Sequence, residues 1–129
     1  RMYPASPWDV ADAAAAGNPR KAMTLLSYLY KHMGDGASVP ITIGLQSLVL
    51  KLIITRQLMD LGEPTSVMAI RLDMHEFPLK KNILPLARRH TVDKLLKQMV
   101  ELCRLETQVK GSARSKRTRV ELAVLSLAA

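Results

Sequence analysis

The sequence is poor in cysteine and in aromatic side chains. Its 129 residues include one cysteine, Cys103, and aromatic residues make up 4% of the chain. A single cysteine forms no internal disulfide, and such a thiol is typical of a reducing compartment. We therefore expect a cytoplasmic protein held together by a hydrophobic core, with Cys103 as a buried, neutral thiol rather than a nucleophile.

The motifs of common nucleotide and metal sites are also missing. Neither the pattern G-x-x-x-x-G-K-[ST] nor G-x-G-x-x-G occurs. No pair among His32, His75 and His90 has the four-residue spacing that places two metal ligands on one helical face. Asp73 and His75 could form an acid–base pair, but neighbours at a helix junction commonly cap backbone groups instead. We expect no cofactor, no metal site and no catalytic site, and hence no enzyme.

No apolar run is long enough to cross a membrane. The most apolar stretch, residues 39–54, is interrupted by polar residues and falls short of the roughly 20 residues that span a bilayer. This stretch predicts a buried helix. Residues 1–4 show neither an apolar signal core nor a cleavage pattern, so we expect this chain to be a fragment of a longer one.

The sequence is rich in helix-forming residues and contains regularly spaced signals for the start and end of helices. Hydrophobic residues make up 48% of the chain, and Leu, Ala, Met, Lys and Arg recur at helical spacing. The pattern predicts an all-α bundle of about seven helices in one domain over residues 1–129. The expected helices start at Ser6-Pro7, Asn18-Pro19, the end of the Gly34–Gly36 loop, Glu63-Pro64-Thr65, the Met74–Pro78 segment, Thr91 and Val120. The segment that ends near Arg89 is expected to kink at Pro85.

Two of these helices carry the clearest apolar faces. In the helix that Leu61-Gly62 closes, the inward side chains are expected to be Leu45, Leu48, Val49, Leu52 and Ile53, with Ile41, Leu50 and Ile54 widening the stripe. In the helix that Gly111 ends, they are expected to be Val92, Leu95, Leu96, Met99, Leu102 and Cys103.

Positive charge is concentrated in the second half of the chain. The net charge is +8; residues 1–70 contain six basic and five acidic residues, and residues 71–129 contain thirteen and six. The densest run consists of Lys110, Arg114, Lys116, Arg117 and Arg119. Such a run fits nonspecific phosphate contacts, and it equally fits a solvated loop or an acidic neighbouring subunit.

The stretch Pro64–Leu86 has the apolar spacing of a helix-turn-helix, with its turn at Asp73-Met74. In a DNA reader the second helix would present basic side chains to the major groove, here Lys80, Lys81 and Arg88. A packed helical corner gives the same pattern. A DNA-binding regulator therefore stands as the alternative function.

Two other features indicate a protein partner. Trp8, the single tryptophan, lies near the start of the first expected helix, where a large aromatic side chain can anchor a contact with a partner or pack within the domain. The last helix carries apolar residues on more than one face. We expect Trp8, Leu122 and Leu125 at an interface between subunits.

Three groups of motifs follow one another along the chain. The first consists of Trp8 to Ala13, Gly17-Asn18, Lys21-Ala22 and Leu25-Leu26. The second consists of Met74-His75, Phe77, Lys80-Lys81, Leu84, Ala87 to Arg89 and Thr91. The third consists of Leu102, Leu105, Val109 to Gly111, Glu121-Leu122 and Leu125. The order of these motifs resembles the C-terminal domain of the bacterial DNA polymerase III delta subunit.

The resemblance implies a non-catalytic domain that joins other clamp-loader subunits, of the gamma/tau and delta prime types, in a ring-shaped collar. It implies an N-terminal AAA+-like module, absent from this chain, through which the full subunit would reach the sliding clamp. ATP sites would belong to other subunits, and contact with DNA would be indirect or weak.

Overall fold

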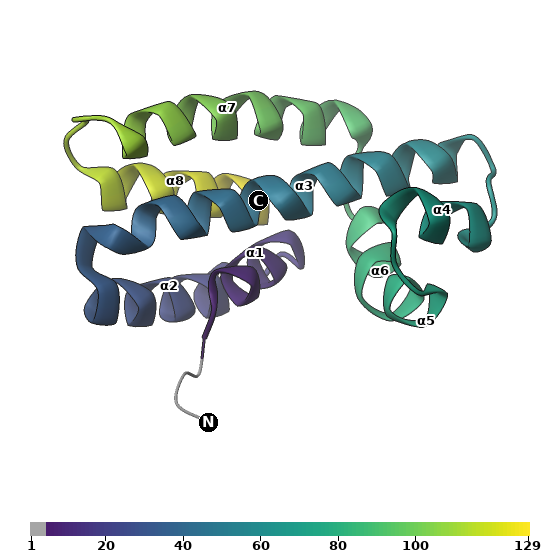
Figure 1. The fold of residues 1–129 in the computed structure, drawn as a ribbon, viewed down its shortest axis with the longest axis horizontal. Coiled ribbons are helices and arrows are strands. Elements are labelled where there is room, and N and C mark those ends of the chain that lie inside the picture. Colours follow the sequence, from purple (N-terminus) through teal and green to yellow (C-terminus); the bar gives the residue numbers. More distant parts are fainter. Residues whose placement is uncertain (1–4) are drawn as a thin grey trace.

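The computed structural model describes residues 5–129, and this part of the chain is helical, with no strand (Figure 1). Its elements are α1 (Pro7–Ala15), α2 (Pro19–Met33), η1 (Gly34–Ala37), α3 (Ser38–Asp60), α4 (Thr65–Leu72), α5 (Glu76–Pro78), η2 (Leu79–Ile83), α6 (Leu84–Ala87), α7 (Val92–Lys110) and α8 (Lys116–Ala128). Six helices have eight residues or more, and α5, η2 and α6 run on as one composite segment. The expectation of about seven helices in an all-α fold is confirmed. The expectation for residues 1–4 lies outside the described residues.

Polar side chains start three helices where the sequence predicts them. The Ser6 hydroxyl accepts a hydrogen bond from the Asp9 amide (3.4 Å), and the Asp9 carboxylate accepts one from the Ser6 amide (2.8 Å). This reciprocal pair is a capping box. The Asn18 side chain accepts from the Lys21 amide at 3.1 Å, and the Thr91 hydroxyl caps α7 in the same way. The three starts are therefore fixed by local sequence.

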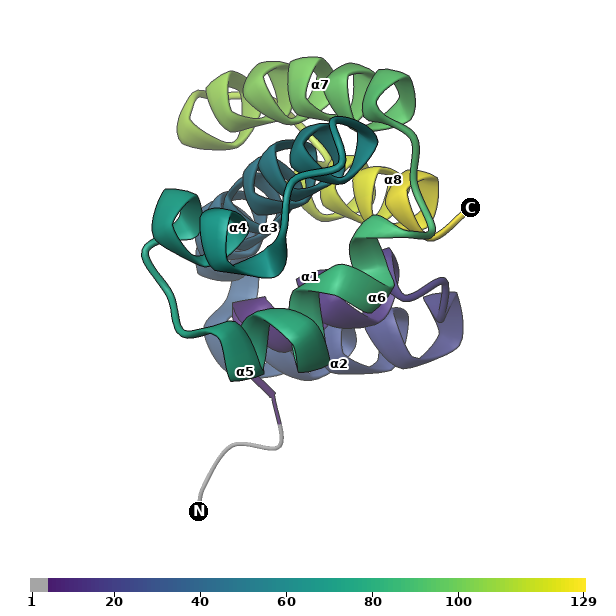
Figure 2. The same cartoon turned by 90° about the vertical axis from the view of Figure 1, so that its right-hand side faces the viewer.

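Helix α3 is the centre of the fold. It lies between α7 on one side and the pair α1 and α2 on the other, with α8 beside it (Figures 1 and 2). Its inner side chains, such as Ile41, Leu45 and Leu52, are fully buried. Ile43 and Leu50 are exposed instead, so the prediction that Leu50 widens the buried stripe is wrong. The described bundle covers part of the circumference of α3 and leaves its outer side open.

By length and composition alone, the stretch Pro19–Asp60 would suffice to cross a membrane, so the expectation that no apolar run is long enough is wrong. A buried core helix passes the same test. More than half of its most apolar portion is buried inside the fold, and α3 supplies most of the core residues there.

Helix α7 is rotated relative to the prediction. Its buried residues are Leu95, Gln98, Leu102, Leu105 and Val109, whereas Leu96 and Cys103 are exposed. The rotation follows from α8, which packs against the Gln98 edge of α7. The Gln98 amide donates to the Ser126 hydroxyl at 2.8 Å, so a polar side chain is buried with its partner. Cys103 is therefore not the buried thiol that the sequence predicts.

Helix α8 begins earlier than expected, at Lys116 rather than Val120. The prediction of Val120 rested on the polar, strongly basic residues 112–118. Basic residues in a first turn oppose the helix dipole. The Arg117 guanidinium, however, bonds the Glu121 carboxylate one turn later at 3.0 Å. That pair offsets part of the unfavourable interaction and carries the helix through the basic run.

Pro85 changes the helix geometry where the sequence predicts a kink. Proline has no amide hydrogen, and in an α-helix its ring would collide with the carbonyl four residues earlier, that of Lys81. The turn before Pro85, Leu79–Ile83, is a wider π-helix, which moves that carbonyl away. The α4–α6 segment consequently packs against the C-terminal half of α3 as a separate corner (Figure 2).

His90 connects this corner to α1. Its ring is buried, and the Nε2 atom lies 2.8 Å from the carbonyl oxygen of Ala15, so Nε2–H is the donor. The Nδ1 atom is buried and has no hydrogen-bond partner among the described residues. Burial lowers the pKa of the His90 imidazole, the bond to Ala15 opposes this, and the nearby charges of Lys94 and Arg89 lower the pKa further. The native fold therefore favours the neutral form of His90.

Acid should destabilise the protein through this residue. With the folded-state pKa below the ordinary value of 6.5, the unfolded chain binds more protons between these two values. Stability should be greatest above pH 6.5, fall as the pH drops through that window, and level off below the folded-state pKa. Urea unfolding between pH 8 and pH 5 measures the free energy of unfolding at each pH. His90→Gln should flatten the part of the pH profile that depends on His90. Identical pH profiles would contradict the assignment.

Candidate functional site

The outer side of α8 carries the two leucines that the sequence places at an interface. Leu122 is 62% exposed and Leu125 is 41% exposed. The opposite side of the same helix is buried through Val120, Val124 and Leu127. Because the inner side of α8 packs into the core, Leu122 and Leu125 on its outer side are available to a partner. Apolar exposure of this kind on one helix face is a feature of interaction surfaces.

A groove of about 440 Å³ runs between α7 and α8, with Leu122 in its wall. Its other wall includes Glu101 and Arg104, which form an exposed ion pair at 2.8 Å, and Leu105 lies between them and α8. The groove thus combines an apolar strip with charged edges. This arrangement suits an amphipathic protein segment.

Trp8 lies in a different place. It is 52% exposed and lines a cleft of about 820 Å³ between α1 and the α4–α6 corner, opposite Lys81 and Pro85. Asp12 also lines this cleft, and burial, followed by the charge of Asp9, raises the pKa of its carboxyl group. The two grooves share no residue. The structure therefore separates Trp8 from the Leu122–Leu125 face.

The first group of predicted phosphate contacts lies on the α5–α6 segment. Lys80 pairs with Glu76 on the same helical segment at 3.7 Å, and both side chains are about half exposed. The Lys81 ammonium lies over the Phe77 ring, 5.9 Å from its centre. Arg88 is exposed just after α6. Two of the three cations thus have partners within their own segment.

The second group surrounds the turn between α7 and α8. Lys110 pairs with Glu106, and Arg117 pairs with Glu121, donates to Ser27 at 3.1 Å and lies 5.1 Å from the centre of the Tyr30 ring. Arg119 donates to the carbonyl oxygen of Arg114 at 2.8 Å, and Lys116 forms no ion pair with residues 5–129. Two acids therefore neutralise part of this cluster.

The two basic groups lie at opposite ends of α7, one before its first residue and one around its last. A helix of 19 residues is about 28 Å long. The groups therefore do not form one continuous basic surface. The corner expected for a helix-turn-helix is present, with Asp73 in a left-handed turn after α4, but a π-helix and Pro85 interrupt its second helix.

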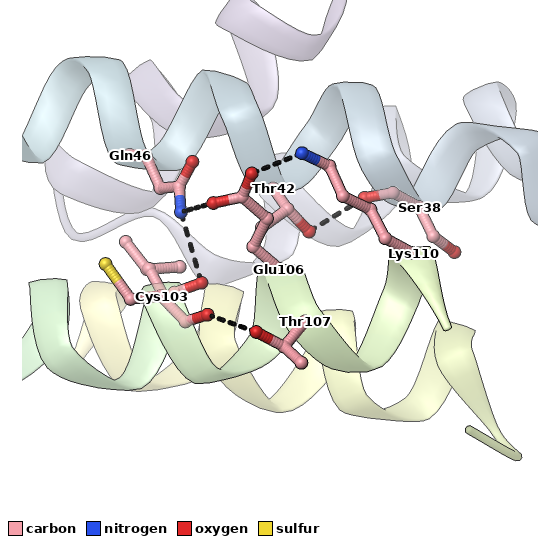
Figure 3. A network of polar contacts seen from close by, with 8 residues as sticks. Ser38, Thr42, Gln46, Cys103, Glu106, Thr107 and Lys110 are labelled. Carbon is pink, nitrogen blue, oxygen red and sulfur yellow. Dashed lines mark hydrogen bonds and ion pairs between the residues drawn. The ribbon is translucent and has the colours of Figure 1, made fainter. Parts of the chain in front are cut away.

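A polar network joins α3 to α7 on the outer side of the bundle (Figure 3). The Gln46 amide donates to the Glu106 carboxylate at 2.9 Å and to the Leu102 carbonyl oxygen at 3.3 Å. Hydrogen bonds from Lys110 and then Gln46 lower the pKa of Glu106. Cys103 lies beside this network. The network fixes the register of the two helices, and residue patterns do not reveal it because its partners lie about 60 residues apart.

Groups of His, Cys, Asp and Glu that could hold a metal ion do not occur among residues 5–129. The arrangement of the described side chains is that of apolar faces, grooves and paired surface charges. It is suited to binding a protein.

Comparisons with known proteins show which proteins this chain resembles. A search of curated proteins finds no match. Among solved structures, the Bacillus subtilis DNA clamp loader delta protein (YqeN) is similar, with a TM-score of 0.79 and 16% sequence identity. The similarity covers 95% of this chain and 35% of that chain, so this chain spans about a third of the length of the structure it matches.

The sequence itself matches the family described as DNA polymerase III delta subunit, C-terminal domain, over residues 6–127. This match extends from the Ser6 cap of α1 to the last turn of α8, and the fold similarity covers the same helices. The chain belongs to this family, the C-terminal domains of DNA polymerase III delta subunits.

Proposed function

We propose that this chain is an assembly domain that joins the collar of a clamp loader and performs no catalysis. Its partners would be the corresponding domains of gamma/tau and delta prime type subunits, in the cytoplasm. The loader that it helps to hold together would place the sliding clamp on DNA during replication. Contact with the clamp would belong to a part of the protein outside this chain.

The exposed Leu122–Leu125 face of α8 is the observation that carries this proposal. The described residues provide no other segment that covers it, and the adjacent groove has charged edges suited to a polar rim. Stable interfaces combine such an apolar centre with a polar rim. Family membership supplies the kind of partner.

The alternative, a DNA-binding regulator, has no support in the family or in the fold match. Lys80 and Lys81 interact within their own segment, and the two basic groups are about a helix length apart. We propose that any DNA contact is weak and nonspecific, with the phosphate contacts made by Arg114 and Lys116.

The double substitution Leu122→Asp and Leu125→Asp should weaken assembly without unfolding the domain. Two carboxylates in the centre of the interface would have to be buried without partners, which should raise the dissociation constant by about tenfold or more. The measurement is titration with purified collar domains of the partner subunits, followed by light scattering. Leu61→Asp, at an exposed position where α3 ends, is the matched control. Unchanged binding by the double variant would contradict this interface.

A further inference from the structure

The cleft beside Trp8 has no role in the proposed assembly through α8. It measures about 820 Å³ and lies between α1, α2 and α3 on one side and the α4–α6 corner on the other. Ligand sites in proteins commonly measure about 300–1,000 Å³ and combine an apolar lining with a few polar groups. The size of this cleft therefore suits a bound ligand, and the residues that line it indicate the kind.

The floor of the cleft is apolar. Leu48 and Ile83 line the cleft and are almost fully buried, whereas Trp8 at its rim is half exposed. A large aromatic side chain beside such a floor gains from contact with an apolar group, because the contact removes both surfaces from water. The cleft therefore suits a ligand with a large apolar side chain.

Three lysines from three elements surround this floor. Lys21 belongs to α2, Lys51 to α3 and Lys81 to η2, and all three are exposed and line the cleft. The ion pairs formed within residues 5–129 involve other basic residues. The Lys81 ammonium lies 5.9 Å from the centre of the Phe77 ring, at the outer limit of a cation–π contact. The three cations are thus available to anionic groups of a ligand.

Two aspartates in the same cleft do not cancel this charge. The Asp9 carboxylate accepts hydrogen bonds from the Ser6 amide at 2.8 Å and from the Ser6 hydroxyl at 3.2 Å. Burial, followed by the charge of Asp9, raises the pKa of the Asp12 carboxyl group, and the charges of Lys51 and Lys21 lower it. Three lysines against two aspartates leave a positive excess in the cleft. Such an excess attracts an anionic ligand.

The two walls of the cleft are held at a fixed spacing. The His90 Nε2–H group donates to the Ala15 carbonyl oxygen at 2.8 Å, and the Arg89 guanidinium packs on Gly17 in the turn after α1. These contacts join the end of the α4–α6 corner to the end of α1. Because the walls need not be ordered by a ligand, binding loses little conformational freedom.

We infer that this cleft binds an extended acidic peptide segment of a protein that is not a collar subunit. A phenylalanine or leucine of the peptide packs on the apolar floor beside Trp8, and flanking carboxylates reach Lys51 and Lys81. The cleft shares no residue with the groove beside Leu122, so the peptide and a collar partner can bind at the same time. The inference goes beyond the proposed assembly function and does not depend on it.

The lining favours a peptide over a nucleic acid. Arginine is the usual side chain for bidentate phosphate recognition, and the described residues that line this cleft include lysines and no arginine. A nucleic-acid strand carries a negative charge on every nucleotide, so it would also meet Asp9 and Asp12. A peptide can place its carboxylates only where the lysines lie.

Trp8 provides the direct readout, because it is the single tryptophan and lines the cleft. The probe is a synthetic peptide of sequence SDDFDDLDDS, which contains no tryptophan. On binding, the emission of Trp8 should shift to shorter wavelength as the indole leaves water. A peptide with serine in place of its two apolar residues, and one with asparagine in place of every aspartate, should each bind about tenfold or more weakly.

Charge reversal on both walls tests the lysines. Lys51→Glu with Lys81→Glu should raise the dissociation constant of the labelled peptide, measured by fluorescence anisotropy, by about tenfold or more. Lys31→Glu with Lys97→Glu makes the same change of net charge at exposed lysines outside the cleft, and it should change the constant by less than about threefold. Trp8→Ala, which keeps every charge, should weaken binding by about tenfold. Circular dichroism checks that each variant is folded.

The peptide site is contradicted if the peptide does not bind, if it binds without shifting the emission of Trp8, or if the two double variants weaken binding equally. Displacement of the peptide by a short thymidine oligonucleotide would make the cleft a nucleic-acid site, and displacement by purified partner collar domains would make it a subunit contact. Either displacement overturns the inference. Failure of the collar domains to bind this chain at all would instead remove the assembly function and leave the peptide site standing.

Discussion

Leu52→Ala is expected to destabilise the domain by roughly 2–5 kcal/mol, the usual cost of removing a fully buried leucine side chain from a core. Leu52 is 0% exposed and belongs to α3, the helix against which α1, α7 and α8 pack. The loss combines the transfer of apolar atoms with the cavity that remains, since surrounding helices relax incompletely. Urea unfolding followed by Trp8 fluorescence and by circular dichroism measures the change.

Leu50→Ala is the matched control, two residues away on the same helix. Leu50 points outward, so its truncation should change stability by less than about 0.5 kcal/mol. Comparing Leu52→Ala with Leu50→Ala therefore tests which side of α3 faces the core. Equal losses from the two substitutions would show that the outer side of α3 is buried.

Gly44→Val is expected to destabilise the fold by about 1–3 kcal/mol through overpacking. A β-carbon added at Gly44 would lie 3.1 Å from the carbonyl oxygen of Pro7, which belongs to the backbone of α1. Relief requires α1 to move as a unit, because its first turn is held by the Ser6 capping box. Gly44→Ala should lose less, since alanine favours a helix over glycine by about 1 kcal/mol.

Ser47→Val controls for the change of residue type, as Ser47 lies one turn further along α3 on the outer side. Ser47→Val should leave the free energy of unfolding almost unchanged. The measurement is again urea unfolding at neutral pH. Wild-type stability of Gly44→Val would mean that α1 does not pack against α3 at this distance.

The helical elements were predictable because their signals are local. Ser6, Asn18 and Thr91 bond amides three residues away, and Pro85 affects the carbonyl four residues before it, so each can be located from neighbouring letters alone. The start of α8 was missed because the ion pair between Arg117 and Glu121 offsets an unfavourable first turn. That balance is an energetic comparison which a pattern of residue types does not contain.

The orientation of α7 was not predictable from its own sequence. Leu95 and Leu96 are adjacent and equally apolar, so either could start the buried stripe. The packing of α8, through Gln98 and Ser126, decides between them. A glutamine in the core looks wrong until its partner, 28 residues later, is known. The exposure of Leu96 and Cys103 is the consequence, and sequence patterns could not show it.

Part of the candidate site could likewise be predicted from the sequence, and part depends on tertiary packing. The final helix carries more apolar residues than one face can bury, so the exposure of Leu122 and Leu125 could be expected from the sequence. That Trp8 lies in a separate cleft follows from how α1 meets the α4–α6 corner, which is a tertiary relationship. Likewise, the basic residues all fall in the second half of the sequence, but the fold places them in two groups at opposite ends of α7.

The most direct test of the assembly function is the mass, by light scattering after size exclusion, of this chain mixed with collar domains of gamma/tau and delta prime type subunits from the same organism. We expect a complex whose mass exceeds that of any component and which persists when moderate salt weakens phosphate contacts. A mixture in which every component elutes at its own mass, while this chain binds short duplex DNA tightly, would contradict the assembly function.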